Sequence, residues 1–153
     1  MKSSRKNLVV GVTVFVSTIV LISMVVLFNN KTIKNDLIEL NSTLDRYTIE
    51  YQSERGFGND RFDIYSFKLK EINEKIPFKT IDKEFQDSYN NFESMLENIE
   101  TERQLDTRRI RTKIEKYISS EDTKYMNIEL EGTKKLYLHN EKMNKGYCLI
   151  LTI

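Results

Sequence analysis

The longest apolar stretch of the chain lies near its N-terminus. Residues 8–28 carry no charged side chain and consist mostly of valine, leucine, isoleucine and phenylalanine. A helix of this length rises about 30 Å, which is the thickness of the hydrocarbon core of a bilayer. Because a lone strand would leave its backbone groups unsatisfied in lipid, the pattern predicts a transmembrane helix over residues 8–28.

The flanks of this stretch predict its orientation. Residues 1–7 hold Lys2, Arg5 and Lys6 and no acid, whereas basic and acidic side chains are soon balanced after residue 30. Cytoplasmic flanks are enriched in lysine and arginine, so we expect residues 1–7 in the cytoplasm and the rest outside the cell membrane. The stretch is longer than the apolar part of a cleaved signal peptide and no small-residue cleavage site follows it. We therefore interpret it as the uncleaved signal-anchor of a single-pass protein.

Two small residues within the predicted span are four positions apart. Thr13 and Ser17 form a small-xxx-small pattern, which allows two membrane helices to approach closely. The alternative is that both side chains simply face lipid.

Beyond the span, apolar residues recur at alternating intervals of three and four residues. This seam is typical of a helix that packs along its length against another helix, as in a coiled coil. Gly56 and Gly58 then end the pattern. The residues of the seam are Ile33, Leu37, Leu40, Leu44, Tyr47 and Tyr51.

The remaining chain shows further apolar stripes at helical spacing. One runs from Phe62 to Ile76 and ends at Pro77, and the next is capped by Thr80 and continues to Ile99. Another stripe resumes at Ile110, and a capping-box pattern from Ser119 predicts a last helix that Gly132 weakens. The sequence therefore predicts an all-α fold: a transmembrane helix followed, over residues 29–146, by an extracytoplasmic antiparallel bundle of about four helices.

Residues 147–153 form a short apolar C-terminal tail. Seven residues are too few to cross a bilayer as a helix. Three interpretations remain open: the tail packs on the bundle, enters the lipid interface, or is the stump of a second span. The order of span, external bundle and second span resembles the layout of bacterial chemoreceptors and sensor kinases. That resemblance rests on layout alone and implies no functional residue.

Composition narrows the function classes. The 24 basic and 23 acidic residues almost cancel, which gives no general argument for nucleic acid as a partner. The single cysteine, Cys148, excludes an internal disulfide. The chain contains no alanine and is rich in lysine, isoleucine and asparagine, which is typical of an AT-rich bacterial genome.

Candidate catalytic residues are few. His139 is the only histidine, so a two-histidine zinc site is impossible, and a cysteine–histidine pair would have to use Cys148. We interpret His139 as an ordinary exposed helical residue. No catalytic motif is present, so the sequence predicts no catalytic residue, no metal, no cofactor and no enzymatic activity.

Charge is segregated along the third helical region. Residues 82–102 are rich in acids and residues 103–116 are rich in bases. Arg108, Arg109 and Arg111 are the best candidates for a contact surface. The alternative is a solvated helix face whose charges pair locally.

Together these features predict a non-enzymatic single-pass membrane protein whose external helical domain mediates protein–protein contact. The predicted partners are the lipid bilayer and a second protein or another copy of the chain, but no nucleic acid. The alternative is a ligand-sensing ectodomain, or a truncated remnant of a two-span bacterial sensor.

Overall fold

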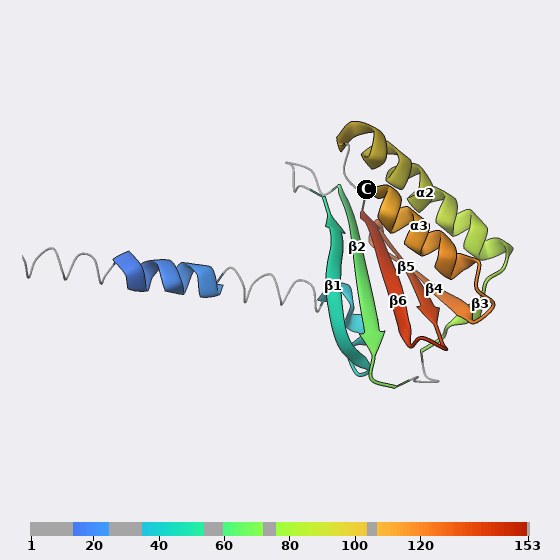
Figure 1. The fold of residues 1–153 in the computed structure, drawn as a ribbon, viewed down its shortest axis with the longest axis horizontal. Helices are drawn as coiled ribbons and strands as arrows, with labels where there is room; N and C mark the ends of the chain where they lie inside the picture. The colour runs from blue at the N-terminus through green and yellow to red at the C-terminus, as the bar shows by residue number, and fades with distance from the viewer. Residues whose placement is uncertain (1–13, 25–34, 54–59, 72–75, 104–106, 153) are drawn as a thin grey trace, which may run out of the picture. The chain divides into compact units, whose positions relative to one another are not determined.

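The computed structural model describes residues 14–24, 35–53, 60–71, 76–103 and 107–152. The chain divides into two compact units, Met1–Asn41 and Ser42–Ile153. The first unit contains a helix over residues 14–24 and the short 3-10 helix η1 (Ile38–Leu40). The second unit is a mixed α/β domain with a six-stranded antiparallel sheet (Figure 1). The predicted all-α fold with its coiled-coil-like helical bundle is therefore wrong.

The structure also contradicts the predicted transmembrane helix. Among the described residues, no helix combines the length and the apolar character needed to cross a membrane. Residues 14–24 rise only about 16 Å as a helix. The rest of the predicted span, residues 8–13 and 25–28, lies outside the described residues, as does the basic flank 1–7. The single-pass topology, the cell-membrane localisation and the bilayer as a partner are contradicted together with the span.

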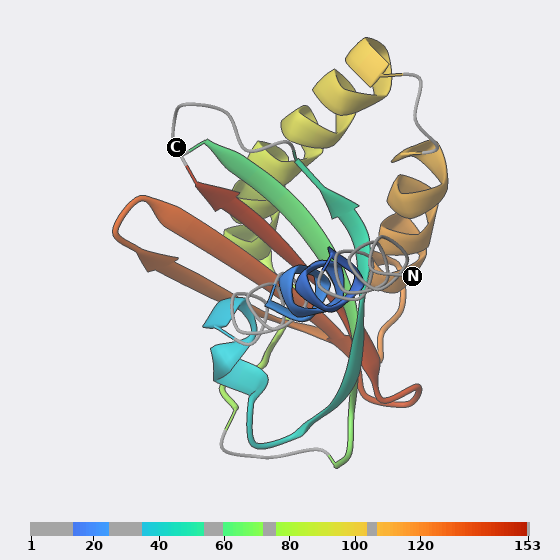
Figure 2. The same ribbon diagram turned by 90° about the vertical axis from the view of Figure 1, so that its left-hand side faces the viewer.

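The sheet has the strand order β1-β2-β6-β5-β4-β3, and all its pairs are antiparallel. Figure 2 shows β2 in green beside β6 in red, although these strands are far apart in the sequence. The strands are β1 (Leu44–Gln52), β2 (Arg61–Leu69), β3 (Lys79–Thr80), β4 (Thr123–Leu130), β5 (Thr133–Asn140) and β6 (Lys145–Thr152).

Helices α2 (Lys83–Arg103) and α3 (Thr107–Ile118) lie on one side of this sheet (Figure 1). The apolar stripes of the sequence predicted helices in both places, and this part of the prediction is confirmed. The start of α2 differs from the prediction. Thr80 belongs to β3, and the helix is capped by Asp82, whose Oδ1 accepts hydrogen bonds from the Phe85 backbone N–H at 3.0 Å and the Tyr125 hydroxyl at 2.8 Å.

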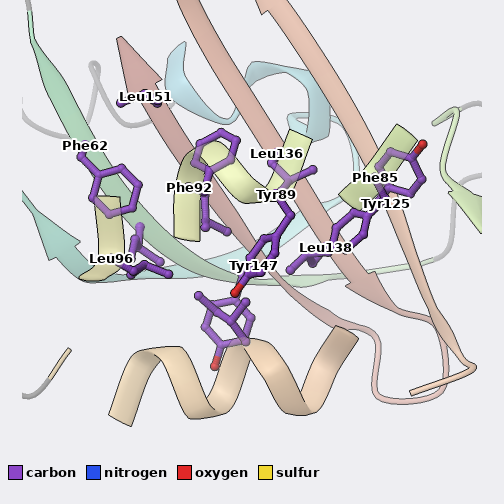
Figure 3. Packing of buried hydrophobic residues seen from close by; sticks show 13 residues of the cluster. Phe62, Phe85, Tyr89, Phe92, Leu96, Tyr125, Leu136, Leu138, Tyr147 and Leu151 are labelled. Atoms are coloured by element: carbon purple, nitrogen blue, oxygen red, sulfur yellow. The ribbon is translucent and has the colours of Figure 1, made fainter. Parts of the chain in front are cut away.

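The hydrophobic core lies between these helices and the sheet. Phe62 of β2 meets Phe92 of α2 at a ring-centroid distance of 6.4 Å, and Phe85 meets Tyr125 of β4 edge-on at 5.2 Å. Figure 3 shows these two contacts at opposite ends of the cluster. Its buried members are Phe62, Ile64, Phe85, Tyr89, Phe92, Leu96, Ile114, Tyr125, Leu136, Leu138, Tyr147, Leu149 and Leu151.

Strands β1 and β2 replace two of the predicted helices. In β1, the pairing register shifts between Leu44 and Arg46 and again between Ile49 and Tyr51. These irregularities disturb the two-residue alternation of a strand and leave apolar residues at helix-like spacing. Strand β2 is buried on both faces, with an almost continuous buried stretch from Phe62 to Tyr65. Its apolar residues change from even to odd positions between Ile64 and Tyr65, which leaves Phe62, Tyr65 and Leu69 at helix-like spacing.

The predicted last helix is a β-hairpin formed by β4 and β5. Its two-residue turn consists of Glu131 and Gly132, with φ of 50° and 77°. Positive φ at both central positions matches the twist of a tight hairpin, and glycine adopts it without steric cost. Gly132 therefore makes a turn rather than weakening a helix.

The apolar tail, residues 147–153, belongs to a strand as far as the structure describes it. Residues Lys145–Thr152 form β6, which pairs with β2 on one side and β5 on the other. The residues of β6 from Gly146 to Leu151 are all buried, so both faces of this interior strand are covered. This accounts for the unbroken apolar character of the tail.

Candidate functional site

Three basic residues form a row across the helix-bearing face of the sheet. Arg46 of β1 is paired with Lys68 of β2, and Lys68 is paired with Lys145 of β6. Residues directly opposite each other in an antiparallel pair share one face. Since neighbouring strands are about 4.8 Å apart, the row places three positive charges side by side. Like charges in directly opposite positions destabilise a sheet, so this row has an energetic cost in the unliganded domain.

A second row, made of hydroxyl groups, lies next to the basic row. Thr48 of β1 is paired with Ser66 of β2, and Ser66 is paired with Tyr147 of β6. Each of these residues is two positions along its strand from the corresponding basic residue and faces the same side. Six hydrogen-bond donors from three strands therefore line one small area.

The two rows line an open groove with a volume of about 360 Å³. We call it the basic groove. Tyr117 of α3 forms a wall, and its ring meets that of Tyr147 edge-on at a centroid distance of 5.0 Å. Burial raises the pKa of Tyr117, and burial, assisted by the charge of Glu50, raises the pKa of Tyr147 to about 12. Both hydroxyls are therefore protonated at neutral pH and are able to donate.

The acids near the basic groove leave most of its positive charge unpaired. Glu50 lines the groove, but its Oε2 accepts a hydrogen bond from Lys113 Nζ of α3 at 3.2 Å. Asp45 Oδ2 is 3.9 Å from Lys68 Nζ, the outer limit of an ion pair. Arg46 and Lys145 are exposed and form no ion pair with any residue that the structure describes. An anion entering the groove meets two cations, Arg46 and Lys145, that are not paired with any described acid.

The three arginines of the predicted contact surface on α3 lie in different environments. Arg111 joins the two helices, with its guanidinium within 3.3 Å of Glu93 and Glu97 on α2 and 2.9 Å from Glu115 on α3. It is therefore largely engaged within the domain. Arg108 and Arg109 lie exposed on α3, where their role as a contact surface stays a prediction.

The other predicted pair, Thr13 and Ser17, is only partly described. Ser17 lies exposed on the helix of residues 14–24, and Thr13 lies outside the described residues. This pair was expected to pack two transmembrane helices together, and the predicted transmembrane helix is contradicted by the structure.

His139 and Cys148, the candidate catalytic pair, lie on the sheet face opposite the groove. His139 of β5 is paired with Gly146, and Cys148 of β6 is paired with Tyr137. Both side chains are buried, so the prediction of an exposed helical His139 is wrong. The imidazole stacks on Phe67 and Phe78, at centroid distances of 6.2 and 5.1 Å. Among the described residues, no group of three or more histidine, cysteine or acidic side chains is placed to hold a metal ion.

Burial lowers the pKa of His139, whereas its hydrogen bond to Asn144 opposes this shift. The Asn144 amide donates to the Leu69 carbonyl at 2.9 Å, so its Oδ1 faces His139 Nε2 at 3.3 Å. The neutral ring therefore carries its proton on Nε2 and donates it to Asn144.

This burial predicts a pH-dependent stability. Below about pH 6.5 the unfolded chain binds a proton at His139 that the folded chain rejects. The free energy of unfolding should therefore fall as the pH decreases from 7.5 through 6.5 towards the lowered folded pKa. Denaturation at pH 7.5 and 5.5 measures this change, and the variant His139→Phe, which keeps the stacking ring, should show a smaller change. Equal changes in both proteins would contradict this prediction.

No local sequence signal marked the basic groove. Arg46, Lys68 and Lys145 are widely separated in the sequence, and each looks like an ordinary exposed basic residue. Only the strand register brings them into one row.

The fold and the groove define a mixed α/β domain whose antiparallel sheet carries a row of cations beside a row of hydroxyls. A scan against protein-family models matches none, and searches of curated proteins and of solved structures return no match.

Proposed function

We propose that this chain is a non-enzymatic binding domain that holds a small oxyanion ligand in the basic groove. The observation that carries the proposal is the row formed by Arg46, Lys68 and Lys145. Charges of one sign placed in opposite positions repel each other, and a bound anion relieves that repulsion. The groove therefore gains more from an anionic ligand than a surface with scattered lysines would.

The chemistry of the groove favours oxyanions. The guanidinium of Arg46 provides a planar pair of donors that suits carboxylate and phosphate oxygens, and the two lysines add charged donors. The hydroxyls of Thr48 and Ser66 supply neutral donors from the neighbouring row. A volume of about 360 Å³ is in the range of small-molecule sites.

The placement of titratable groups supports binding rather than catalysis. A general base or acid needs a pKa near the working pH and a position within hydrogen-bond reach of the ligand. His139 and Cys148 lie on the opposite face of the sheet, and the carboxylate in the groove, Glu50, is held by Lys113. The groove side chains are suited to hold and neutralise a ligand.

The test is calorimetric titration of the full chain with phosphate, sulfate, pyrophosphate and citrate at fixed ionic strength. At least one anion should bind with one-to-one stoichiometry, and added sodium chloride should weaken the binding. Losing a charged hydrogen bond costs about 1.5 kcal/mol or more, so Arg46→Gln and Lys145→Gln should each weaken the binding of the tightest-binding anion at least about tenfold.

Lys142→Gln is the matched control. Lys142 is exposed in the turn before β6 and does not line the groove, so this substitution removes one positive charge outside the groove. It should leave the affinity within about twofold of the unmodified chain. If none of the anions binds, or if the groove variants behave like the control, the proposed function is wrong. Release of phosphate from pyrophosphate by the intact chain, absent in the groove variants, would show an enzyme instead.

A further inference from the structure

The geometry of the basic row specifies the ligand more closely. Resting on the proposed function, we infer that the basic groove takes a linear chain of phosphate groups that lies across β1, β2 and β6. Arg46, Lys68 and Lys145 stand on three successive strands, so the row spans about 10 Å from its first to its last strand. A chain of phosphates offers each cation its own anionic group along this line.

A single compact anion uses the row less well. To meet all three cations at once it would have to draw Arg46 and Lys145 inward over Lys68, which brings three like charges together around one group. Lys68 is also less exposed than its two neighbours and is 3.9 Å from Asp45. An extended polyanion leaves each basic side chain near its own strand and keeps the cations apart.

The hydroxyl row favours phosphate over carboxylate. Thr48, Ser66 and Tyr147 run parallel to the basic row, about 7 Å away along the strands. A ligand lying between the rows is offered donors from both sides. The two oxygens of a planar carboxylate point in one general direction, whereas the oxygens of a tetrahedral phosphate point towards both rows. The Tyr147 hydroxyl, whose pKa burial raises to about 12, is protonated at neutral pH and can donate to the ligand.

The experiment compares phosphate, pyrophosphate, tripolyphosphate and the linear tricarboxylate tricarballylate by calorimetry on the full chain, at constant ionic strength and without divalent cations. The affinity should rise at least about tenfold from phosphate to pyrophosphate and again to tripolyphosphate, as each added group meets another charged donor. Tricarballylate should bind at least about tenfold more weakly than tripolyphosphate. A nucleoside triphosphate is a further arm. Weaker binding than tripolyphosphate assigns the inorganic chain, equal affinity shows that the groove contacts only the phosphates that both ligands share, and tighter binding assigns an organic triphosphate.

Variants at the two ends of the row separate a specific chain site from general attraction. Arg46→Gln and Lys145→Gln should each weaken tripolyphosphate at least about tenfold but weaken phosphate by a smaller factor, because phosphate does not reach both ends. Lys142→Gln should change neither, and circular dichroism verifies that each variant is folded.

The possible failures are distinguishable. If phosphate binds as tightly as tripolyphosphate, or if tricarballylate equals tripolyphosphate, the phosphate-chain inference is overturned while the proposed oxyanion-binding function stands. If no anion binds, both are overturned.

Discussion

Replacing Gly146 with alanine should destabilise the domain by about 3 kcal/mol or more. A Cβ at this position would overlap the Leu138 carbonyl oxygen on β5 and the ring of Phe67, whose Cε1 would be 2.9 Å away. The ring lies there because Phe67, Gly146 and His139 are opposite one another on three adjacent strands, and Phe67 reaches across the glycine to stack on His139. The carbonyl belongs to the backbone of an interior strand and cannot move aside without breaking the ladder.

Chemical denaturation followed by circular dichroism measures this effect, and loss of a cooperative transition would be its extreme form. Gly132→Ala is the matched control. It places the same methyl group in the β4–β5 turn, at a φ of 77°, where the strain amounts to about 1–2 kcal/mol. A loss at Gly146 no larger than the loss at Gly132 would refute the steric argument.

Replacing Asp63 with asparagine should also be severe, with an expected loss of about 3 kcal/mol. The carboxylate is fully buried and accepts hydrogen bonds from Arg61 Nε at 2.7 Å, the Tyr65 hydroxyl at 3.2 Å and the Ser53 backbone N–H at 3.2 Å. All three partners are donors. An amide would turn an N–H group towards donors, and Arg61, whose side chain is only 16% exposed, would lose its counter-charge.

Two further variants separate charge from packing at Asp63. Tyr65→Phe removes one hydroxyl from the network and should cost about 1 kcal/mol. The double variant Arg61→Met/Asp63→Leu removes the whole ion pair and should recover part of the loss seen in Asp63→Asn, because apolar pairs often replace buried ion pairs without penalty. If Asp63→Asn is no worse than Tyr65→Phe in denaturation experiments, the carboxylate is not the centre of this network.

The helices α2 and α3 could be predicted from the sequence because one face of each helix is buried against the sheet and the opposite face is exposed to solvent. In α2, Phe85, Tyr89, Phe92 and Leu96 face the sheet, and the residues between them face solvent, so the helical period is visible. The same holds for α3, where Ile114 is buried while Thr112, Glu115 and Lys116 are exposed.

The strands could not be recognised by the same reasoning. The apolar run of β6 is unbroken because both faces of that strand are covered, and the apolar residues of β2 change faces between Ile64 and Tyr65. The register shifts in β1 imitate helical spacing. Gly132 was a local signal of the β4–β5 hairpin, since a tight hairpin turn needs positive φ and glycine adopts it without steric cost. Interpreting it inside a helix led to the wrong fold class.

The basic groove was beyond the reach of sequence reasoning for a different reason. Its rows depend on which residues stand opposite one another, and one residue of slippage would move Lys68 or Ser66 to the other face of the sheet. Local spacing carries no information on such long-range pairing. The charge blocks of α2 and α3 predicted a contact surface on α3 instead, but Arg111 of that surface binds acids of its own domain.

The position of β6 in the sheet affects how the domain folds during its synthesis. The β1–β2 hairpin and the β4–β5 hairpin have no direct ladder between them, and β6, which follows the other five strands of the sheet along the chain, lies between the two. Until β6 is synthesised, the halves of the sheet expose unpaired edges to other nascent chains and to chaperones. The sheet is therefore complete only after β6 has left the ribosome. The contacts between β2 and β6 join segments of high sequence separation, which slows their formation.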